Sequence, residues 1–523
     1  MSLFRSAFTV SFYISLSRIV GFVRDMFIAQ YLGVSTLSDA FFAAFRLPNF
    51  FRRVFGEGAM NSAFVPIFVE KLQDKKTDMD EKVFMQNVFS ILLYVLLIFT
   101  LLFQIFMPFL MKILFPGFVT DIEKFTLLVT LSRITIFYLI FISLVALCSG
   151  VLNSLGKFSV PASSPIILNL TLIFSIFVFG QFVPNYAYAL SIGVVVAGVL
   201  QFLWLLFFTI KSGMLLYPKP PSLKLFRNAD IKKFFRKLLP GVIGGNVLQI
   251  NLLIDSVFAS MIAGAVSYLY YADRINQLPL AMIGIAIGTA LLPAMSRKIK
   301  AQELEGAIKL QNIALEVGLI VVIPATLALT CLAYPIISTL FERGKFTHEE
   351  SFFVANALMF YSFGLPAYVL VKVMEPAFFS RGDTRTPMTI AIICLFSNAI
   401  LNAIFFFHGL EYVGIILASI ISSYLNLYLL ITKLLRKKHF YFEKGFVVKL
   451  LKIILPSIVM AVALLSMKDY FAKSQHFNQI IELIFMILVG IIIYFVAAYF
   501  SGSLDILMRS GILKRKRANV GQF

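Results

Sequence analysis

The chain has 523 residues, of which 60% are apolar or aromatic and only 14% are charged. Ordinary soluble proteins have roughly 45–50% apolar and about 25% charged residues, so this composition excludes a water-soluble globule. The net charge of +20 would suggest nucleic acid as a partner in a soluble protein, but in a membrane protein basic residues first report topology. We therefore expect an integral membrane protein that binds no nucleic acid.

Apolar stretches long enough to cross a bilayer recur along the whole chain, each covering the minimum of about 20 residues. They predict an all-α membrane protein with fourteen transmembrane helices. The expected spans lie near residues 7–31, 38–69, 83–111, 125–152, 158–181, 186–210, 238–263, 266–295, 310–341, 352–379, 387–408, 412–434, 446–467 and 478–500.

Two pairs of motifs indicate an internal repeat. Ser154–Pro161 and Ser380–Pro387 both read Ser-x-Gly-x4-Pro, and a Leu-Pro pair occurs at Pro48 and again at Pro279. Such offsets predict two parallel six-helix halves with a site between them. The expected divisions are an N-terminal half (1–215), a basic cytoplasmic linker (216–237), a C-terminal half (238–436), and helices 13 and 14 with a basic tail (437–523).

Lysine and arginine concentrate in the loops on the side of residue 1, as in Lys211 to Lys237 and Lys433 to Lys452. Basic residues are retained on the cytoplasmic side of a membrane. This asymmetry predicts that both termini are cytoplasmic. The first apolar stretch has charges inside it and no cleavage site after it, so we expect it to be a retained helix and not a signal peptide.

Several basic residues fall inside the expected spans, where facing lipid would cost each roughly 2.5–3.5 kcal/mol or more. They must face a cavity or a partner. Arginine stays protonated in a dry cavity and makes paired hydrogen bonds to phosphate oxygens, so a convergent group indicates a diphosphate or several carboxylates. The set comprises Arg18, Arg24, Arg46, Arg52, Arg53, Arg133, Arg274 and Lys372.

Four of these, Arg18, Arg24, Arg52 and Arg274, lie in helices 1, 2 and 8, which are matching early helices of the two halves. We expect them to form the substrate site. The alternative, that they are helix-end side chains and structural ion pairs, stays open and is preferred for Arg46, Arg53 and Arg133. The expected supporting residues are Asp25, Asp39, Arg53, Glu57 and Lys372.

Glycine and proline mark the places where the early helices can bend. We expect hinges at Gly33, Pro48, Gly56 and Pro279, and we expect Ala29, Ala43 and Ser267 to line a water-filled cleft. Asn251 and Asp255 are four residues apart and so share a helix face. They are either ligands for a sodium ion or a pair that takes up a proton, or they are structural hydrogen-bonding residues.

Long motifs resemble one known family. They are SRIVGFVRD (Ser17–Asp25), SDAFFAAFRLPNFFRRVFGEGAMNSAFVP (Ser38–Pro66), YYADRINQLP (Tyr270–Pro279), GKFT (Gly344–Thr347) and FFSRGDTRTP (Phe378–Pro387). These motifs are similar to the MurJ (MviN) lipid II flippases of the multidrug/oligosaccharidyl-lipid/polysaccharide transporter superfamily. The resemblance extends over essentially the whole chain.

The resemblance implies a flippase of peptidoglycan synthesis, and so of cell-wall growth and cell shape. It would move undecaprenyl-diphosphate-linked lipid II across the bacterial cytoplasmic membrane by alternating access. It further implies that Arg18, Arg24, Arg52 and Arg274 bind the diphosphate, that Asp25 organises them, and that helices 13 and 14 form a groove for the lipid tail. Membrane lipids and the cell-wall synthesis machinery are the expected partners.

Other functions stay open. A flippase for another polyprenyl-diphosphate glycan would need the same arginines, whereas a MATE-like drug exporter should have an acidic, aromatic cavity. An enzyme of lipid-linked sugar transfer would need carboxylates spaced for a metal or a base, and the sequence shows no such spacing. We expect a transporter without enzyme activity, metal or cofactor, driven by the membrane potential or by a sodium or proton gradient.

Overall fold

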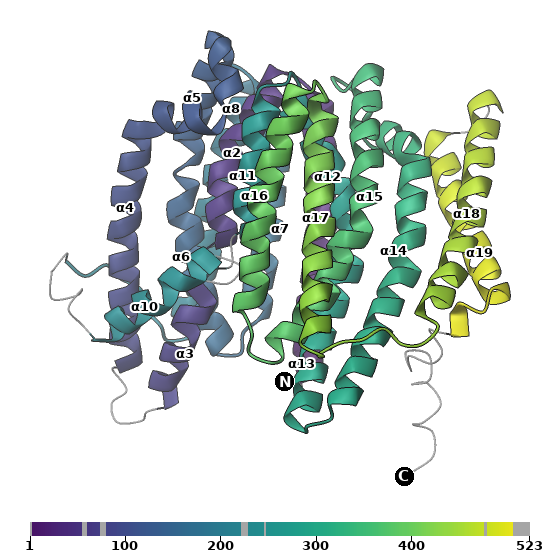
Figure 1. The fold of residues 1–523 in the computed structure, drawn as a ribbon. Coiled ribbons are helices and arrows are strands. Elements are labelled where there is room, and N and C mark those ends of the chain that lie inside the picture. Colours follow the sequence, from purple (N-terminus) through teal and green to yellow (C-terminus); the bar gives the residue numbers. More distant parts are fainter. Residues whose placement is uncertain are drawn as a thin grey trace. The chain divides into compact units, whose positions relative to one another are not determined.

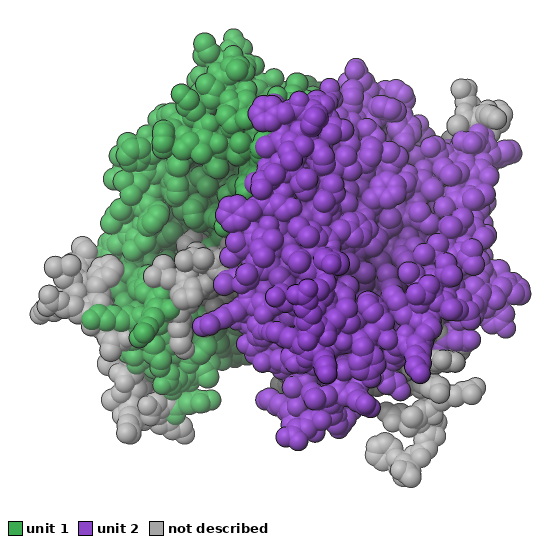
Figure 2. All heavy atoms as spheres, in the orientation of Figure 1, with its two compact units in different colours: residues 1–267, 343–346 green, residues 268–342, 347–523 purple. Residues whose placement is uncertain are grey.

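The computed structural model describes residues 3–54, 60–73, 80–220, 229–244, 247–474 and 478–505, which are helical with short connections and contain no strand (Figure 1). The expected supporting residue Glu57, the expected hinge Gly56 and the basic tail lie outside these residues. The chain forms two compact units. Unit 1 comprises residues 1–267 and 343–346, and unit 2 comprises residues 268–342 and 347–523 (Figure 2).

Unit 1 consists of helices that carry the first predicted spans. The expected second span (38–69) is covered by α2 and α3, the fourth (125–152) by α5 and α6, and the seventh (238–263) by α10 and α11. The bounds are α1 (Leu3–Leu32), α2 (Thr36–Val54), α3 (Met60–Gln73), α4 (Asp80–Leu114), η2 (Pro116–Thr120), α5 (Ile122–Thr135), α6 (Tyr138–Ser154), α7 (Ser159–Val178), η3 (Phe179–Gln181), α8 (Tyr186–Lys211), α10 (Ala229–Gly244) and α11 (Val247–Ser260).

The α2 helix continues through Pro48, which has no amide hydrogen to donate. Proline thereby leaves the carbonyl of the residue four positions earlier without its helical partner. That carbonyl belongs to Ala44, and the Thr135 hydroxyl of α5 donates to it at 3.0 Å. A side chain on a neighbouring helix thus satisfies the carbonyl that Pro48 leaves free.

Unit 2 begins within the first turn of α12. After Pro279 the helix passes into a π-helical turn, a common site of bending. The bounds are α12 (Ala265–Pro279), η4 (Leu280–Ile285), α13 (Ala286–Lys300), α14 (Leu304–Phe341), α15 (His348–Phe379), α16 (Arg385–Phe407), α17 (Glu411–Arg436), α18 (Phe446–Ser474) and α19 (Gln479–Phe500).

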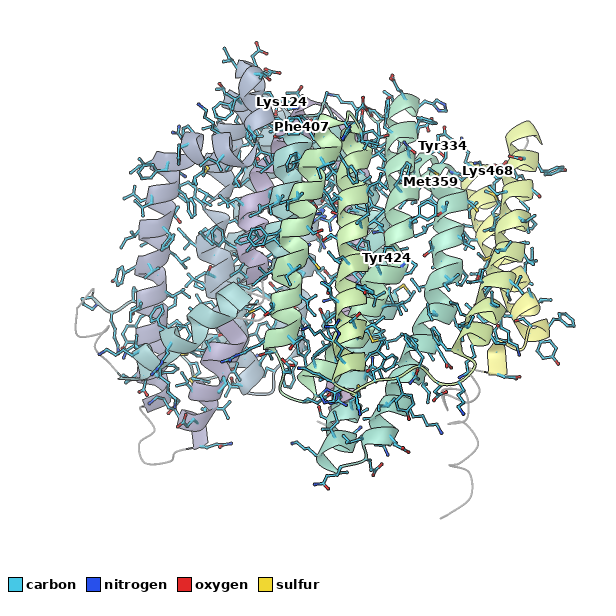
Figure 3. All side chains as sticks on the ribbon, in the orientation of Figure 1. Lys124, Tyr334, Met359, Phe407, Tyr424 and Lys468 are labelled. Atoms are coloured by element: carbon cyan, nitrogen blue, oxygen red, sulfur yellow. The ribbon has the colours of Figure 1, made fainter. Side chains whose placement is uncertain are left out.

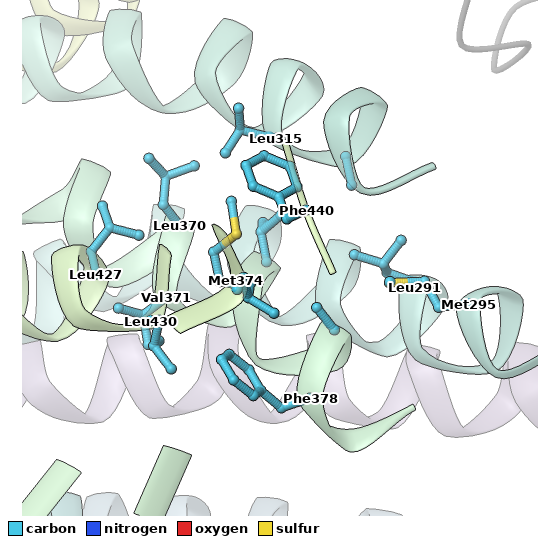
Figure 4. Packing of buried hydrophobic residues seen from close by; sticks show 14 of the residues in the cluster. Leu291, Met295, Leu315, Leu370, Val371, Met374, Phe378, Leu427, Leu430 and Phe440 are labelled. Carbon is cyan, nitrogen blue, oxygen red and sulfur yellow. The ribbon is translucent and has the colours of Figure 1, made fainter. Parts of the chain in front are cut away.

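The apolar core of unit 2 brings side chains of α13, α14, α15 and α17 together with Phe440 from the connection before α18 (Figure 4). Met374 and Phe378 are almost completely buried there. The connection is also held by polar groups, because Asn312 of α14 donates to the Tyr441 carbonyl at 2.9 Å. This packing ties the last two helices to the rest of unit 2.

Helices α18 and α19 pack on each other and on α14. A Cβ at Gly490 would lie 2.9 Å from a Leu464 methyl carbon, so glycine allows the close approach of the two helices. The Tyr494 hydroxyl donates to the Ile320 carbonyl of α14 at 2.6 Å. Most of the remaining surface of the pair consists of exposed large apolar residues.

Within the described residues, eleven helical stretches are long and apolar enough to span a membrane. The prediction of an all-α, multi-pass membrane protein is therefore confirmed. The three expected spans outside this set are those near 7–31, 38–69 and 238–263. The last two are each interrupted by residues that the structure does not describe.

Candidate functional site

A buried ion pair lies in the C-terminal third of α1. Arg24 and Asp25 are 6% and 2% exposed, and the guanidinium donates to the Asp25 carboxylate through Nε at 3.0 Å and Nη2 at 2.6 Å. Its Nη1 donates to the Asn169 side-chain oxygen of α7 at 2.8 Å. Asp25 therefore contacts one of the four arginines that the resemblance had implied it organises.

Asn169 was not among the expected site residues, although an amide inside an apolar helix was a signal in the sequence. Its own amide group donates to the Ser17 carbonyl of α1 at 3.0 Å, so the side chain joins α7 to α1 at two points. A Cβ at Gly21 would lie 3.1 Å from the Asn169 amide nitrogen, so a larger residue would crowd this contact. Asn169 therefore fixes the orientation of the Arg24 fork.

Arg18 lies six residues before Arg24 on α1, about 9 Å along the axis at a rise of 1.5 Å per residue. Unlike Arg24, its side chain is exposed. Its guanidinium is thus accessible from outside the packed helices of unit 1. The two arginines of α1 have different environments, one preorganised by partners and one exposed.

The α2 arginines are half-buried. Arg52 donates through Nε to the Asn49 side chain at 2.9 Å, one helical turn earlier. Arg46 instead bonds α11, where Nε donates to the Ser256 hydroxyl at 2.6 Å and Nη2 to the Leu252 carbonyl at 3.2 Å. These contacts favour a structural role for Arg46, as the sequence reading preferred, and Arg53 lies beside Arg52 in the last turn of α2.

Asp39 is 1% exposed and accepts three hydrogen bonds. They come from the Ser267 amide at 3.0 Å, the Ser267 hydroxyl at 2.6 Å and the Lys124 ammonium at 2.8 Å. Lys124 lies in the first turn of α5 (Figure 3) and packs over the Phe118 ring. One carboxylate therefore ties together the starts of α2, α5 and α12.

The three residues expected to line a water-filled cleft are buried in this structure. Ala29, Ala43 and Ser267 are each at most 1% exposed. Gly33, an expected hinge, is the left-handed residue that ends α1, with φ of 58°. The segment 343–346 packs at the same helix end, where the Lys345 amide donates to the Gln30 carbonyl at 2.8 Å. Segment 343–346 is thus joined to the end of α1 by a hydrogen bond.

Asp255 is buried on α11, and Asn251 is half-buried one turn earlier on the same helix. Among the described residues there is no group of three or more His, Cys, Asp or Glu side chains placed to hold a metal ion.

In unit 2, Arg274 is half-buried on α12. Its Nη2 donates to the Tyr270 hydroxyl at 2.9 Å, and the guanidinium carbon lies 4.7 Å from the centre of the same ring. The ring face and the hydroxyl of Tyr270 together orient the Arg274 guanidinium. Lys372 on α15 pairs with Glu375 at 3.1 Å, and Gln277 donates to Asp273.

The chain matches the family described as lipid II flippase MurJ over residues 28–501. The chain belongs to the MurJ family. A probable lipid II flippase MurJ of Rickettsia prowazekii (strain Madrid E) is 37% identical over 95% of this chain and 98% of its own length. The corresponding protein of Rhizobium tropici is 36% identical over 99% of this chain and 98% of its own length.

Solved structures agree with this assignment. A lipid II flippase MurJ in an inward closed conformation aligns with a TM-score of 0.79 and 30% identity, over 95% of this chain and 99% of its own. An inward-facing multidrug resistance MATE family transporter aligns with a TM-score of 0.63 over 81% of this chain and 98% of its own. At 16% identity, that likeness shows a shared fold alone. The MurJ family membership makes this a multi-pass membrane transport protein.

Proposed function

We propose that this protein carries lipid II from the inner to the outer leaflet of the bacterial cytoplasmic membrane by alternating access, with arginine side chains holding the diphosphate. The observation that carries the proposal is Arg24, a buried guanidinium fork oriented by Asp25 and Asn169. Membership of the MurJ family supplies the substrate class. Arg18, Arg52 and Arg274 are the further proposed diphosphate ligands.

The proposal includes fourteen spans, with both termini in the cytoplasm and two functional halves of six helices each. The distribution of basic loops supports this topology. Helices α18 and α19 are proposed to accommodate the polyprenyl tail, because they present a continuous apolar surface beside α14. The protein acts as a transporter and not as an enzyme, and the cell-wall synthesis machinery is the proposed consumer of its product.

Arginine substitutions test the site. In a strain depleted of its own flippase, Arg24→Ala, Arg52→Ala and Arg274→Ala should each impair growth. The corresponding lysine variants should rescue only in part, because lysine keeps the charge but not the planar fork. Arg46→Lys is the matched control, since its contacts are structural. Wild-type growth from all three alanine variants would overturn the assignment of the site.

The substrate is tested directly by depleting the protein in cells with radiolabelled lipid II and scoring the leaflet in which the label accumulates. We expect accumulation in the inner leaflet and arrest of cell-wall growth. A flippase for another polyprenyl-diphosphate glycan is the second candidate, because the same arginines would serve it. In that case lipid II would flip normally and only a surface glycan would be lost.

Transport is proposed to be driven by the membrane potential. A diphosphate carries about two negative charges, and moving each out of a cell that is negative inside releases roughly 2.3 kcal/mol per 100 mV. The alternative is coupling to sodium or protons through Asp255 with Asn251. In proteoliposomes with an imposed membrane potential but no ion gradient, the protein should flip lipid II. Flipping that instead requires the ion gradient, and is lost in Asp255→Ala, would favour coupling.

A further inference from the structure

A groove of about 420 Å³ opens on the surface of unit 1 between α4, α5 and α8. Most of its lining is apolar, from Ile134 and Phe137 beside the α5–α6 break and from three residues of α8. The polar lining residues are Gln104 of α4 and Thr130 and Arg133 of α5. The lining residues are Gln104, Thr130, Arg133, Ile134, Phe137, Ile192, Val195 and Val196.

The groove lies where the helix formed by α5 and α6 is broken, without a proline or glycine at the break. In a regular helix the Phe137 amide would bond the Arg133 carbonyl, but here it donates to the Ile134 carbonyl at 3.4 Å. The Gln104 side chain of α4 donates to the Arg133 carbonyl instead, at 2.7 Å. Gln104 thus bridges α4 to the break and forms one polar edge of the groove.

Arg133 gives the groove its charge. It is the one ionised side chain in the lining, and it is exposed. No carboxylate within the described part of the chain forms an ion pair with its guanidinium. An exposed cation on a surface that faces lipid favours an anionic partner from the membrane, because its charge is otherwise uncompensated there.

The groove lies nearer one face of the membrane than the other. Gln104 and Arg133 are both in the half of their membrane spans that is nearer the connection between α4 and α5. A long arginine side chain reaches from that depth toward the headgroup region. Under the proposed topology this is the outer leaflet.

We propose that this groove binds an anionic glycerophospholipid, with its phosphate on Arg133 and one acyl chain on the apolar floor. Charge selects the occupant: a zwitterionic lipid brings an amine that offsets its phosphate, whereas phosphatidylglycerol keeps its net negative charge. The apolar lining selects against a soluble anion, which would leave the floor exposed. The site is separate from the Arg24 cluster and does not depend on the transported substrate.

Tryptophan fluorescence can measure this selectivity. The chain has a single tryptophan, Trp204, which is exposed on α8 outside the groove. Phe137→Trp in a Trp204→Phe background places the fluorophore in the groove instead. In vesicles of brominated phosphatidylglycerol mixed with phosphatidylcholine, quenching of this tryptophan should show about a fivefold preference for the anionic lipid, as expected for one basic residue near the surface.

Arg133→Gln in the same background should reduce the preference to about one, and Arg133→Lys should keep part of it. The native Trp204 is the matched control and should show no preference. An unchanged preference in Arg133→Gln, or an equal preference at Trp204, would overturn the proposal. Native mass spectrometry of the chain without tryptophan changes gives a second readout, in which Arg133→Gln should retain fewer phosphatidylglycerol molecules than Lys112→Gln on α4.

Discussion

Thr135 of α5 donates its hydroxyl hydrogen to the Ala44 carbonyl of α2 at 3.0 Å. The bond matters because Pro48, four residues after Ala44, has no amide to offer that oxygen. Both Thr135 and Ala44 are buried, so water cannot substitute as a partner. The bend-prone segment of α2 is therefore stabilised by a side chain from another helix.

We predict that Thr135→Val destabilises the protein by about 1–3 kcal/mol, the cost of leaving a buried acceptor without a donor. Thermal unfolding in detergent would show this as a lower Tm. Thr130→Val is the control, because that hydroxyl bonds only the Thr126 carbonyl of its own helix. Adding Pro48→Ala to Thr135→Val should recover part of the loss, since alanine restores the amide donor. Equal Tm values for the two threonine variants would contradict this account.

The contributions of Arg24 and Asp25 to the stability of the protein should depend on each other. Removing one partner of a buried ion pair costs about 3–5 kcal/mol, because the other charge stays buried and unpaired. Asp25→Ala should therefore be more destabilising than the double variant Arg24→Ala with Asp25→Ala. Tm values for the two single variants and the double variant complete a double-mutant cycle. Additive losses would show that the two side chains are not coupled.

Opening of the Asp39 cluster should expose Ser267. In a background without Cys148, Cys331 and Cys394, Ser267→Cys should react slowly with a polar thiol reagent, because the position is fully buried. Asp39→Ala removes the acceptor of the Lys124 ammonium and of the backbone amide at position 267, and should accelerate the reaction several-fold. Thr120→Cys, at an exposed position, should react equally in both backgrounds. Rates that do not change with Asp39→Ala would argue against the carboxylate as the closing contact.

Gly344 should not tolerate a side chain. Its φ is 61°, and a Cβ there would lie 2.3 Å from the Gln30 carbonyl oxygen, the acceptor of the Lys345 amide. Gly344→Ala should therefore lower the free energy of unfolding by more than the roughly 1–2 kcal/mol expected from the left-handed conformation alone, and the Tm should fall accordingly. Gly213→Ala is the matched control, with φ of 80° and no atom within 4 Å of the added carbon. Equal losses in the two variants would mean that segment 343–346 moves freely from α1.

The turn that contains His439 should weaken in mild acid. Burial and the nearby positive charges of Arg381 and Lys437 lower the pKa of His439 below its usual value of 6.5. As the pH falls through 6.5, the unfolded chain takes up the proton first, so stability decreases with falling pH in that window. Thermal unfolding between pH 7.5 and 5.5 should show a smaller decrease for His439→Gln than for the unchanged chain. A larger decrease in the variant would reverse the sign of the effect.

The same turn has a second titrating group that acts only at much lower pH. The Lys437 ammonium and the Thr386 amide and hydroxyl hold the pKa of Asp383 at about 2. A carboxylate whose pKa is lowered in the folded state stabilises the protein at pH values above its ordinary pKa near 4. That contribution is lost as the pH falls toward 2. Asp383 therefore stays ionised between pH 7.5 and 5.5 and does not contribute to the change expected in that range.

The amino-acid sequence by itself determined the class of protein and its helical content. Apolar runs and charges are local properties, so they can be read without knowing what each helix touches. The same is true of Pro48 and Pro279, because proline acts on its own backbone: one frees a carbonyl and the other precedes a π-helical turn. Arginines such as Arg24 could be singled out because a charge at membrane depth requires a partner.

Only the tertiary structure decided which partners those groups have. Asn169 is 145 residues from Arg24, and Ser267 is 228 residues from Asp39. Hydrogen bonds need distances near 3 Å, and no sequence spacing determines such a contact between separate helices. The break between α5 and α6 contains no proline or glycine, so the sequence did not predict it. It depends on Gln104 of another helix satisfying the carbonyl that the break leaves free.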